Sequence, residues 1–153
     1  MKKGFTCGSM DLMHAGHFLM LKEAKEHCDH LTVFLQTDPS IDRPEKNKPV
    51  ESIEERKIKL EGCKYVDDIK IYETESDLYN LMQFFKWDIR IIGIDHKGKP
   101  FTGDDLPIEV YYNSRDHEYS TTNIRKRVYE AENQRHISEY TSNRIRDNSE
   151  MSG

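Results

Sequence analysis

The sequence predicts an α/β fold, built as a single doubly wound, mostly parallel five-stranded sheet. Two observations lead to this prediction. Short apolar runs alternate with amphipathic stretches along the chain, which is the pattern of strands separated by helices. The chain has 153 residues, the length of one ordinary domain. Strands joined through helices pair in parallel by right-handed crossovers, so one sheet is expected.

Five apolar runs are expected to form the strands, and four stretches with helical spacing the helices. The predicted strands are 3–7, 31–35, 66–72, 89–94 and 108–112. The predicted helices are 16–28, 52–61, 78–85 and 120–131. Ser52 and Glu55 give the clearest helix start, because they have the spacing of a capping box. Prolines and charged residues make 38–50 a loop.

The last part of the chain is more polar than the rest. Residues 1–130 are predicted to form the domain, and 131–153 a polar C-terminal extension. The extension has only five apolar residues: Ala131, Ile137, Tyr140, Ile145 and Met151. It either continues the last helix or hangs loose, and we favour a solvated tail over a segment that binds a partner.

Composition excludes several classes of protein. The formal net charge is −5, which argues against non-specific nucleic-acid binding because that needs a basic face. No run approaches the roughly 20 apolar residues of a membrane helix, and the first residues lack the apolar core of a secretory signal. The three cysteines Cys7, Cys28 and Cys63 lie far apart, which indicates buried thiols in a reducing cytosol. A cytoplasmic protein is expected.

Unusual residues cluster where the strands are predicted to end. The segments concerned are 7–17, 36–48, 93–99 and 113–122. Doubly wound sheets bind ligands at this carboxyl edge. In the first segment His14 and His17 flank a predicted helix start, and Gly16 would let a ligand approach the backbone. Because a helix N-terminus suits phosphate, we interpret the two imidazoles as a phosphate clamp rather than as simple helix caps.

The run Gly8–His17 resembles the HxGH signature of nucleotidyltransferases. Five further segments resemble, in register, those of the small cytidylyltransferases, most closely the ones acting on glycerol 3-phosphate: Ser52–Lys57, Lys64–Asp67, Gly93–Lys99, Arg115 and Tyr119–Ile124. The resemblance covers residues 3–128. It implies a Rossmann-like HxGH fold and transfer of CMP from CTP to a phosphoalcohol. Glycerol 3-phosphate is the default acceptor, which would give CDP-glycerol and pyrophosphate. Met10, Lys64 and His96 depart from the family pattern, and the departures at Lys64 and His96 leave other acceptors open.

The resemblance and the positions of the motifs together suggest roles for individual residues. The catalytic group comprises His14, His17, Lys46, Arg115, Ser120 and Thr121. The nucleotide-binding group comprises Cys7, Gly8, Ser9, Asp11, Gly16, Arg56, Gly93, Asp95 and Thr122. The acceptor-binding group comprises Lys48, Lys64, Asp67 and His96. Asp11 is also the candidate ligand of Mg²⁺, the expected cofactor, and a salt bridge between helix and strand is an equally favoured interpretation of Arg56 and Asp67.

Two alternative functions stay open. The first is an adenylyltransferase of the same superfamily, using ATP and a sugar phosphate, pantetheine phosphate or flavin, because the HxGH motif does not separate the two nucleotides. The second is a nucleotide-binding module without turnover, which the complete set of predicted catalytic residues disfavours. A zinc site at His14 and His17 would need a third ligand such as Asp11 or Cys7. The expected partners are CTP and a small phosphorylated alcohol, with a homodimer implied by the resemblance.

Overall fold

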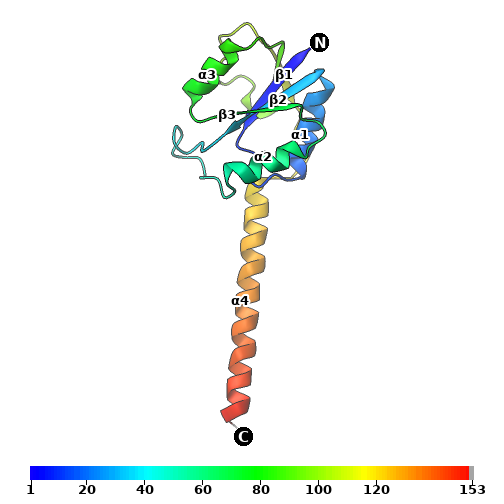
Figure 1. Cartoon of the computed structure of the whole chain (residues 1–153). Coiled ribbons are helices and arrows are strands. Elements are labelled where there is room, and N and C mark those ends of the chain that lie inside the picture. The colour runs from blue at the N-terminus through cyan, green and yellow to red at the C-terminus, as the bar shows by residue number, and fades with distance from the viewer. Residues whose placement is uncertain (152–153) are drawn as a thin grey trace. The chain divides into compact units, whose positions relative to one another are not determined.

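The computed structural model describes residues 1–151 of the chain (Figure 1). These form two compact units, one covering Met1–Tyr119 and one that begins at Ser120. The first unit contains the whole sheet. No helix within residues 1–151 is long and apolar enough to cross a membrane.

The first unit is built on five strands that all run parallel. They are β1 (Lys3–Gly8), β2 (His30–Gln36), β3 (Asp68–Tyr72), β4 (Ile89–Gly93) and β5 (Glu109–Asn113). Their order in the sheet is β3-β2-β1-β4-β5, and every neighbouring pair is parallel. The predicted α/β class and the single five-stranded sheet are therefore confirmed, and the sheet is wholly rather than mostly parallel.

Helices cover both faces of this sheet, as Figure 1 shows. Helices α1 (Ala15–Glu26) and α2 (Ile53–Glu61) bury Leu21 and Leu60 against the face that carries Val33 of β2. Helix α3 (Glu75–Phe84) buries Leu78 against the opposite face, which carries Phe34. Successive residues of a strand point to opposite faces, so β2 contributes to both cores and is buried at six of its seven positions.

The strand order reverses between β1 and β4. The chain adds β2 and β3 on one side of β1 and then crosses to add β4 and β5 on the other. Only two residue pairs, Gly4–Ile89 and Phe5–Arg90, are in register between β1 and β4, against six between β1 and β2. The two strands thus separate toward their carboxyl ends, which is where ligands bind in such sheets.

Element boundaries differ from the prediction mainly at helix starts. Helix α3 begins at Glu75, because Thr74 accepts a hydrogen bond from the main-chain N–H of Asp77 (3.1 Å) and closes a capping box that we had not predicted. The predicted box at Ser52 and Glu55 is confirmed, with both bonds at 3.1 Å.

The second unit is one helix, α4 (Thr121–Met151), of 31 residues. Of the two open possibilities for residues 131–151, a continued helix or a loose segment, the structure has the continued helix. The sequence contains no Gly or Pro in this stretch, and pairs four residues apart stabilise it, such as Arg135 with Glu139 at 3.1 Å. The side chains of residues 131–148 are exposed.

Candidate active site

The turn between β1 and α1 has a strained backbone. Met10 and Leu12 both have left-handed conformations, with φ of 50° and 49°, which non-glycine residues rarely adopt. Met10 is nevertheless held because its side chain is buried in the core. Leu12 is held by its N–H, which donates to the carboxylate of Glu51 at 2.9 Å. Backbone strain of this kind is typical of functional sites.

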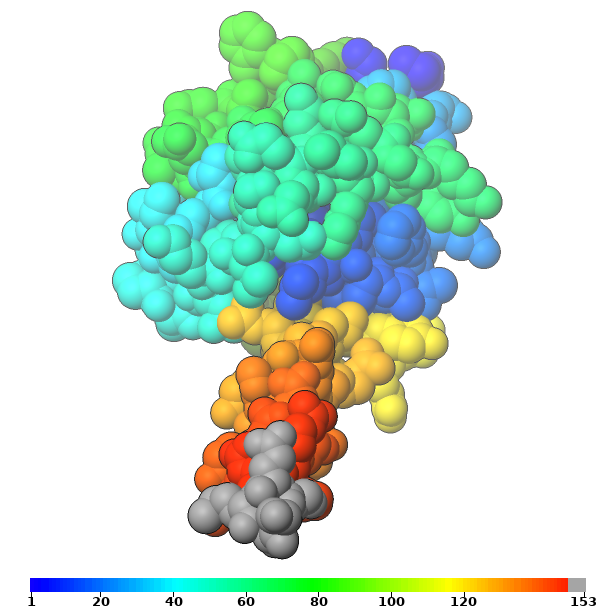
Figure 2. All heavy atoms as spheres, turned by 60° about the horizontal axis from the view of Figure 1, so that its bottom comes forward, coloured from blue at the N-terminus to red at the C-terminus, as the bar shows by residue number. Residues whose placement is uncertain are grey.

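A buried polar network ties this turn to the start of α2. The Asp11 carboxylate accepts hydrogen bonds from the main-chain N–H groups of Val50 and Glu51, at 2.9–3.0 Å. Arg56, which is 2% exposed, donates to five main-chain carbonyls: those of Ser9, Gln36, Thr37, Glu51 and Ser52. In Figure 2 the blue turn and the cyan-to-green start of α2 lie side by side. Asp11 and Arg56 thus fix the main chain around the site. The salt bridge between Arg56 and Asp67, the alternative interpretation of the sequence, does not form.

His14 and His17 cap α1 with one ring nitrogen each. His14 Nδ1 accepts from the N–H of Gly16 at 3.0 Å, and His17 Nδ1 accepts from the N–H of His14 at 3.1 Å. The ring centroids are 4.1 Å apart. A neutral imidazole whose Nδ1 accepts must carry its proton on Nε2. Both rings therefore cap the helix and still have an Nε2–H to donate, so the two interpretations of the sequence are compatible.

The environment keeps both imidazoles neutral. Burial, and then the neighbouring His14, lower the pKa of His17 to about 4. The pKa of His14 is also lowered, first by partial burial and then by His117 and Arg115. Near neutral pH both rings are therefore uncharged hydrogen-bond donors rather than cations.

Gly16 leaves space for two imidazoles. A Cβ at this position would lie 2.7 Å from Cε1 of both His14 and His117. The close approach of a ligand to the Gly16 backbone stays a prediction. The main-chain N–H groups of His14 and Gly16 are likewise taken by the caps. A phosphate at this tip would bind to imidazole N–H groups more than to these two main-chain groups.

His117 is a third imidazole at the α1 tip. His117 is not among the residues predicted from the sequence, because a histidine in a loop is usually solvated. It is half-buried, and its Nδ1 accepts from the N–H of Tyr119 at 3.1 Å, which again leaves the proton on Nε2. Arg115 is exposed and near enough to help lower the pKa of His14. The structure thus brings His14, His17, Arg115 and His117 together.

A cavity of about 410 Å³ opens beyond the carboxyl ends of the strands. Among the predicted residues it is lined by Cys7, Gly8, Ser9, Lys46 and His96. Burial raises the pKa of Cys7 to about 11, so its sulfur is a neutral thiol in the wall. Lys48 is exposed and is not among the lining residues.

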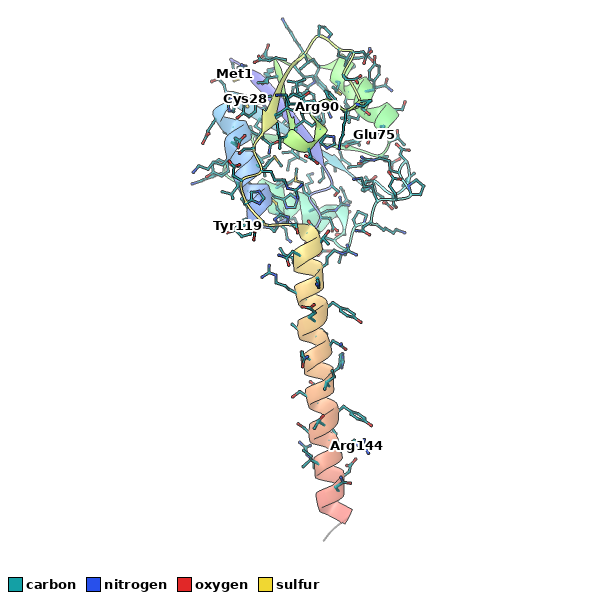
Figure 3. All side chains as sticks on the ribbon, turned by 180° about the vertical axis from the view of Figure 1, so that it is seen from behind. Met1, Cys28, Glu75, Arg90, Tyr119 and Arg144 are labelled. Atoms are coloured by element: carbon teal, nitrogen blue, oxygen red, sulfur yellow. The ribbon has the colours of Figure 1, made fainter. Side chains whose placement is uncertain are left out.

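Arg90 and Arg43 also line this cavity, and neither is among the site residues predicted from the sequence. Arg90 comes from β4 and is 6% exposed. Figure 3 labels it together with Glu75, at the start of α3, which lines the same cavity. An arginine inside the apolar run Ile89–Gly93 was the available signal, because a charge is rarely buried in a strand without a reason.

Two predicted acceptor-binding residues lie at the wrong edge of the sheet. Asp67 precedes β3, where its carboxylate pairs with Lys25 and accepts from the N–H of Leu31 at 2.8 Å. Lys64 is nearby, with its ammonium 5.3 Å from the Tyr65 ring centroid. Both residues are at the amino edge, whereas the cavity is at the carboxyl edge. The resemblance suggests that Lys64 and Asp67 bind the acceptor, but their position at the amino edge puts them away from this cavity.

The remaining predicted residues lie at two places. Gly93 ends β4 and Asp95 lies in the turn after it. A Cβ on Gly93 would come within 2.5 Å of the Asp95 carboxylate, so Gly93 lets that side chain fold back. Ser120, Thr121 and Thr122 begin the second unit. There Ser120 Oγ accepts from the N–H of Asn123 at 3.0 Å and caps α4. The role of these three residues in catalysis stays a prediction.

The residues of the site do not form a metal cage. Within the described part of the chain no three His, Cys, Asp or Glu side chains converge as metal ligands would. Both oxygens of Asp11 already accept main-chain hydrogen bonds. These bonds give Asp11 a structural task, and its role as a ligand of Mg²⁺ stays a prediction.

The chain is similar in sequence to one protein family and to several curated proteins. The profile of the family described as cytidylyltransferase-like matches residues 5–127. Among curated proteins, the bifunctional protein HldE of Campylobacter concisus is 37% identical over 130 residues, which are 84% of this chain and 27% of that protein. HldE of Wolinella succinogenes is 36% identical over 107 residues, 69% of this chain and 22% of that protein. The chain thus spans about a quarter of the length of these relatives.

Solved structures share the fold. A lipopolysaccharide core biosynthesis protein from Thermoplasma volcanium superposes with a TM-score of 0.60 and 27% identity, covering 78% of this chain and 99% of that one. Pantothenate synthetase from Thermus thermophilus has a TM-score of 0.56 at 14% identity, covering 81% of this chain and 61% of that one, and so supports the fold alone.

Proposed function

The chain belongs to the cytidylyltransferase-like family of nucleotidyltransferases, and we propose that it transfers an adenylyl group from ATP to a small sugar phosphate, releasing pyrophosphate. The observation that carries this proposal is the arrangement of His14 and His17. Each uses Nδ1 to cap α1 and keeps an Nε2–H for a ligand. Two neutral donors at the positive end of a helix dipole, beside a crevice at the strand ends, suit a triphosphate.

The reaction is an in-line displacement at the α-phosphorus. A phosphate oxygen of the acceptor attacks the phosphorus, and a new P–O bond forms. The bond to the oxygen that bridges the α- and β-phosphates breaks, and pyrophosphate leaves with that electron pair. No covalent bond to the protein is needed. The protein contributes positioning and stabilisation of negative charge.

Individual residues would supply that stabilisation. Nε2–H of His14 and His17 donates to triphosphate oxygens and stabilises the charge that builds on the leaving group. Arg115, beside His14, offers a planar fork to the same phosphates. Lys46 lines the cavity from the 38–50 loop and could meet the incoming acceptor. Magnesium stays a predicted cofactor that would bind to the nucleotide phosphates, and no step here depends on it.

The relatives favour ATP and a sugar phosphate over the predicted CTP and glycerol 3-phosphate. The curated relatives described above are HldE proteins and none is named as a glycerol-phosphate cytidylyltransferase, which agrees better with the adenylyltransferase alternative. The Thermoplasma volcanium protein is named for lipopolysaccharide core biosynthesis, and sugars are the building blocks of such a core.

CTP remains the second candidate donor. The segments Ser52–Lys57 and Tyr119–Ile124 resemble those of small cytidylyltransferases, and this observation favours a cytidylyl donor. With CTP the same residues would act on the same phosphates, and only the base would differ. A homodimer and a cytoplasmic location also stay predictions.

Pyrophosphate release distinguishes the two candidates. The purified chain is incubated with ATP or CTP, Mg²⁺ and either glucose 1-phosphate or glycerol 3-phosphate as probes. We expect release with ATP and the sugar phosphate to exceed all other combinations. Greater release with CTP and glycerol 3-phosphate would establish the second candidate. Tight nucleotide binding without release from any acceptor would indicate a binding module.

A further inference from the structure

The cavity at the strand ends has more positive charge than its own carboxylate neutralises. Arg43, Lys46 and Arg90 line it, and Glu75 is the acidic residue among the described lining residues. Glu75 is already engaged, by an ion pair with Arg43 at 3.4 Å and by the hydroxyl of Thr102 at 2.8 Å. Among the residues that the structure describes, no carboxylate forms an ion pair with Arg90.

The guanidinium of Arg90 is buried with hydrogen-bonding capacity to spare. Nη1 donates to the carbonyl of Thr102 and, at 3.9 Å, to the sulfur of Met82. The group lies 4.9 Å from the Phe101 ring centroid and 5.7 Å from that of Phe5. Its Nε is buried and has no partner among the described residues, and the same is true of Arg43 Nε in the same cavity. Buried charges are normally paired, because an unpaired one loses its hydration without compensation.

We propose that Arg90 determines acceptor specificity by binding the acceptor's phosphate monoester, with Arg43 as a second donor. This inference rests on the proposed function and adds the acceptor's contact to it. The phosphate would supply the negative charge that the cavity lacks. Holding it between guanidinium groups would also reduce its repulsion from the triphosphate that it must attack.

The cavity suits the acceptor rather than the nucleotide because of where its walls lie. Tyr72 and Leu78 belong to the core cluster under α3. His14 and His17 stand at the tip of α1, which covers the opposite face of the sheet. An in-line displacement needs attacking and leaving groups on opposite sides of the phosphorus. Triphosphate at the α1 tip and acceptor on the α3 side satisfy that requirement.

The test measures binding to the full-length protein without turnover. Inorganic phosphate and glucose 1-phosphate are titrated by calorimetry into wild type, Arg90→Met and Arg90→Lys, with thermal unfolding as a check on folding. Lys57→Met is the matched control, because it removes one positive charge on α2, outside the cavity lining. ATP binding to each protein is measured separately.

We expect Arg90→Met to weaken binding of both phosphate probes by at least about tenfold, the scale of a hydrogen bond to a charged group. Arg90→Lys keeps the charge but has no donor at the Nε position, and we expect a loss of at least about threefold. Lys57→Met should stay within about twofold of wild type. ATP binding should be unchanged in all three variants.

Wild-type phosphate affinity in Arg90→Met would overturn the proposal. An equal loss of ATP affinity would overturn it too, because the phosphate at Arg90 would then belong to the nucleotide. If Arg90→Met does not fold, Arg90→Lys decides, and wild-type affinity in that variant counts against Arg90. Failure of pyrophosphate release is a separate result, which would refute the proposed function while these titrations still report on Arg90.

Discussion

Arg56 and Arg90 are buried to almost the same degree, 2% and 6% exposed, but their hydrogen bonding differs completely. Arg56, on α2, donates to five main-chain carbonyls. Arg90, on β4, donates to one carbonyl and has a buried Nε without a partner among the described residues. Arg56 fixes the main chain around the site, whereas Arg90 keeps a hydrogen-bond donor available for a ligand. Spare donors, rather than burial, thus distinguish the functional region from the structural one.

The same distinction runs through single side chains at the α1 tip. In His14 and His17 the Nδ1 atom supports the helix and the Nε2–H is available to a ligand. Structural and chemical tasks are therefore separated by atom within one ring. A variant that keeps the cap made by Nδ1 but loses the Nε2–H donor, or the reverse, can test this separation.

The largest effect is expected for Arg56→Met. Five carbonyls lose their donor in a buried environment, and unfolding free energy should fall by about 3–5 kcal/mol. Arg90→Met should lose much less, because it leaves one carbonyl without its donor. Urea unfolding of both variants measures the difference. Equal losses would mean that hydrogen-bond number does not separate the two arginines.

His17→Asn should retain the fold and lose activity. The Asn amide oxygen lies near the position of Nδ1 and can accept the cap bond, but nothing replaces Nε2–H. We expect turnover to fall at least ~100-fold, the scale of removing one donor from an oxyanion hole. Pyrophosphate release, with thermal unfolding as control, gives the result. A folded variant with near wild-type turnover would remove His17 from the mechanism.

Stability should depend on pH through the same ring. The pKa of His17 is about 4 in the folded protein and near 6.5 when unfolded, so between these values the unfolded chain binds more protons. The contribution of His17 to stability is fully present above pH 6.5 and is lost as the pH falls toward 4, by about 3 kcal/mol. Unfolding at several pH values should show this slope, and His17→Asn should flatten it. An unchanged slope in the variant would assign the titration elsewhere.

His17→Gln is the reciprocal change. Its amide reaches the Nε2 position and can donate there, while the cap acceptor is lost. We expect unfolding free energy to fall by about 1 kcal/mol, as for other lost caps, with more activity than His17→Asn. Comparing both variants in one assay tests the separation by atom. If Gln is the less active of the two, the cap rather than the donor sustains turnover.

Truncation after residue 130 should have the smallest effect. The side chains of 131–148 are exposed, so their removal takes away no buried surface. We expect the unfolding free energy of the remaining chain to change by less than about 0.5 kcal/mol. A large drop in the thermal midpoint would show that the extension stabilises the first unit.

The fold could be predicted closely because its signals are local. Alternating apolar runs gave the five strands, and the Ser52–Glu55 box gave the start of α2. Whether the last helix continues past residue 131 stayed open, because sparse apolar residues say little when a helix is held by propensity and i,i+4 pairs alone. The position of Asp67 at the amino edge was not predictable, because motif order does not reveal which edge of the sheet a residue occupies.

Part of the site could not be predicted from the sequence for a related reason. His14 and His17 could be found, since strand, turn and helix are contiguous there. Arg90 and His117 come from distant segments, and only the folded chain shows that one lines the cavity and the other stands beside Gly16. Spare hydrogen-bond capacity is a property of three-dimensional neighbours and leaves no pattern along the chain.

The most direct test of the role of His17 Nε2–H is to compare two proteins, wild type and His17→Asn. Steady-state pyrophosphate release is measured for both with ATP and a sugar phosphate. We predict clear release by wild type and at least ~100-fold less by the variant, with matching thermal midpoints. Comparable release by the two folded proteins would contradict the role given to the imidazoles.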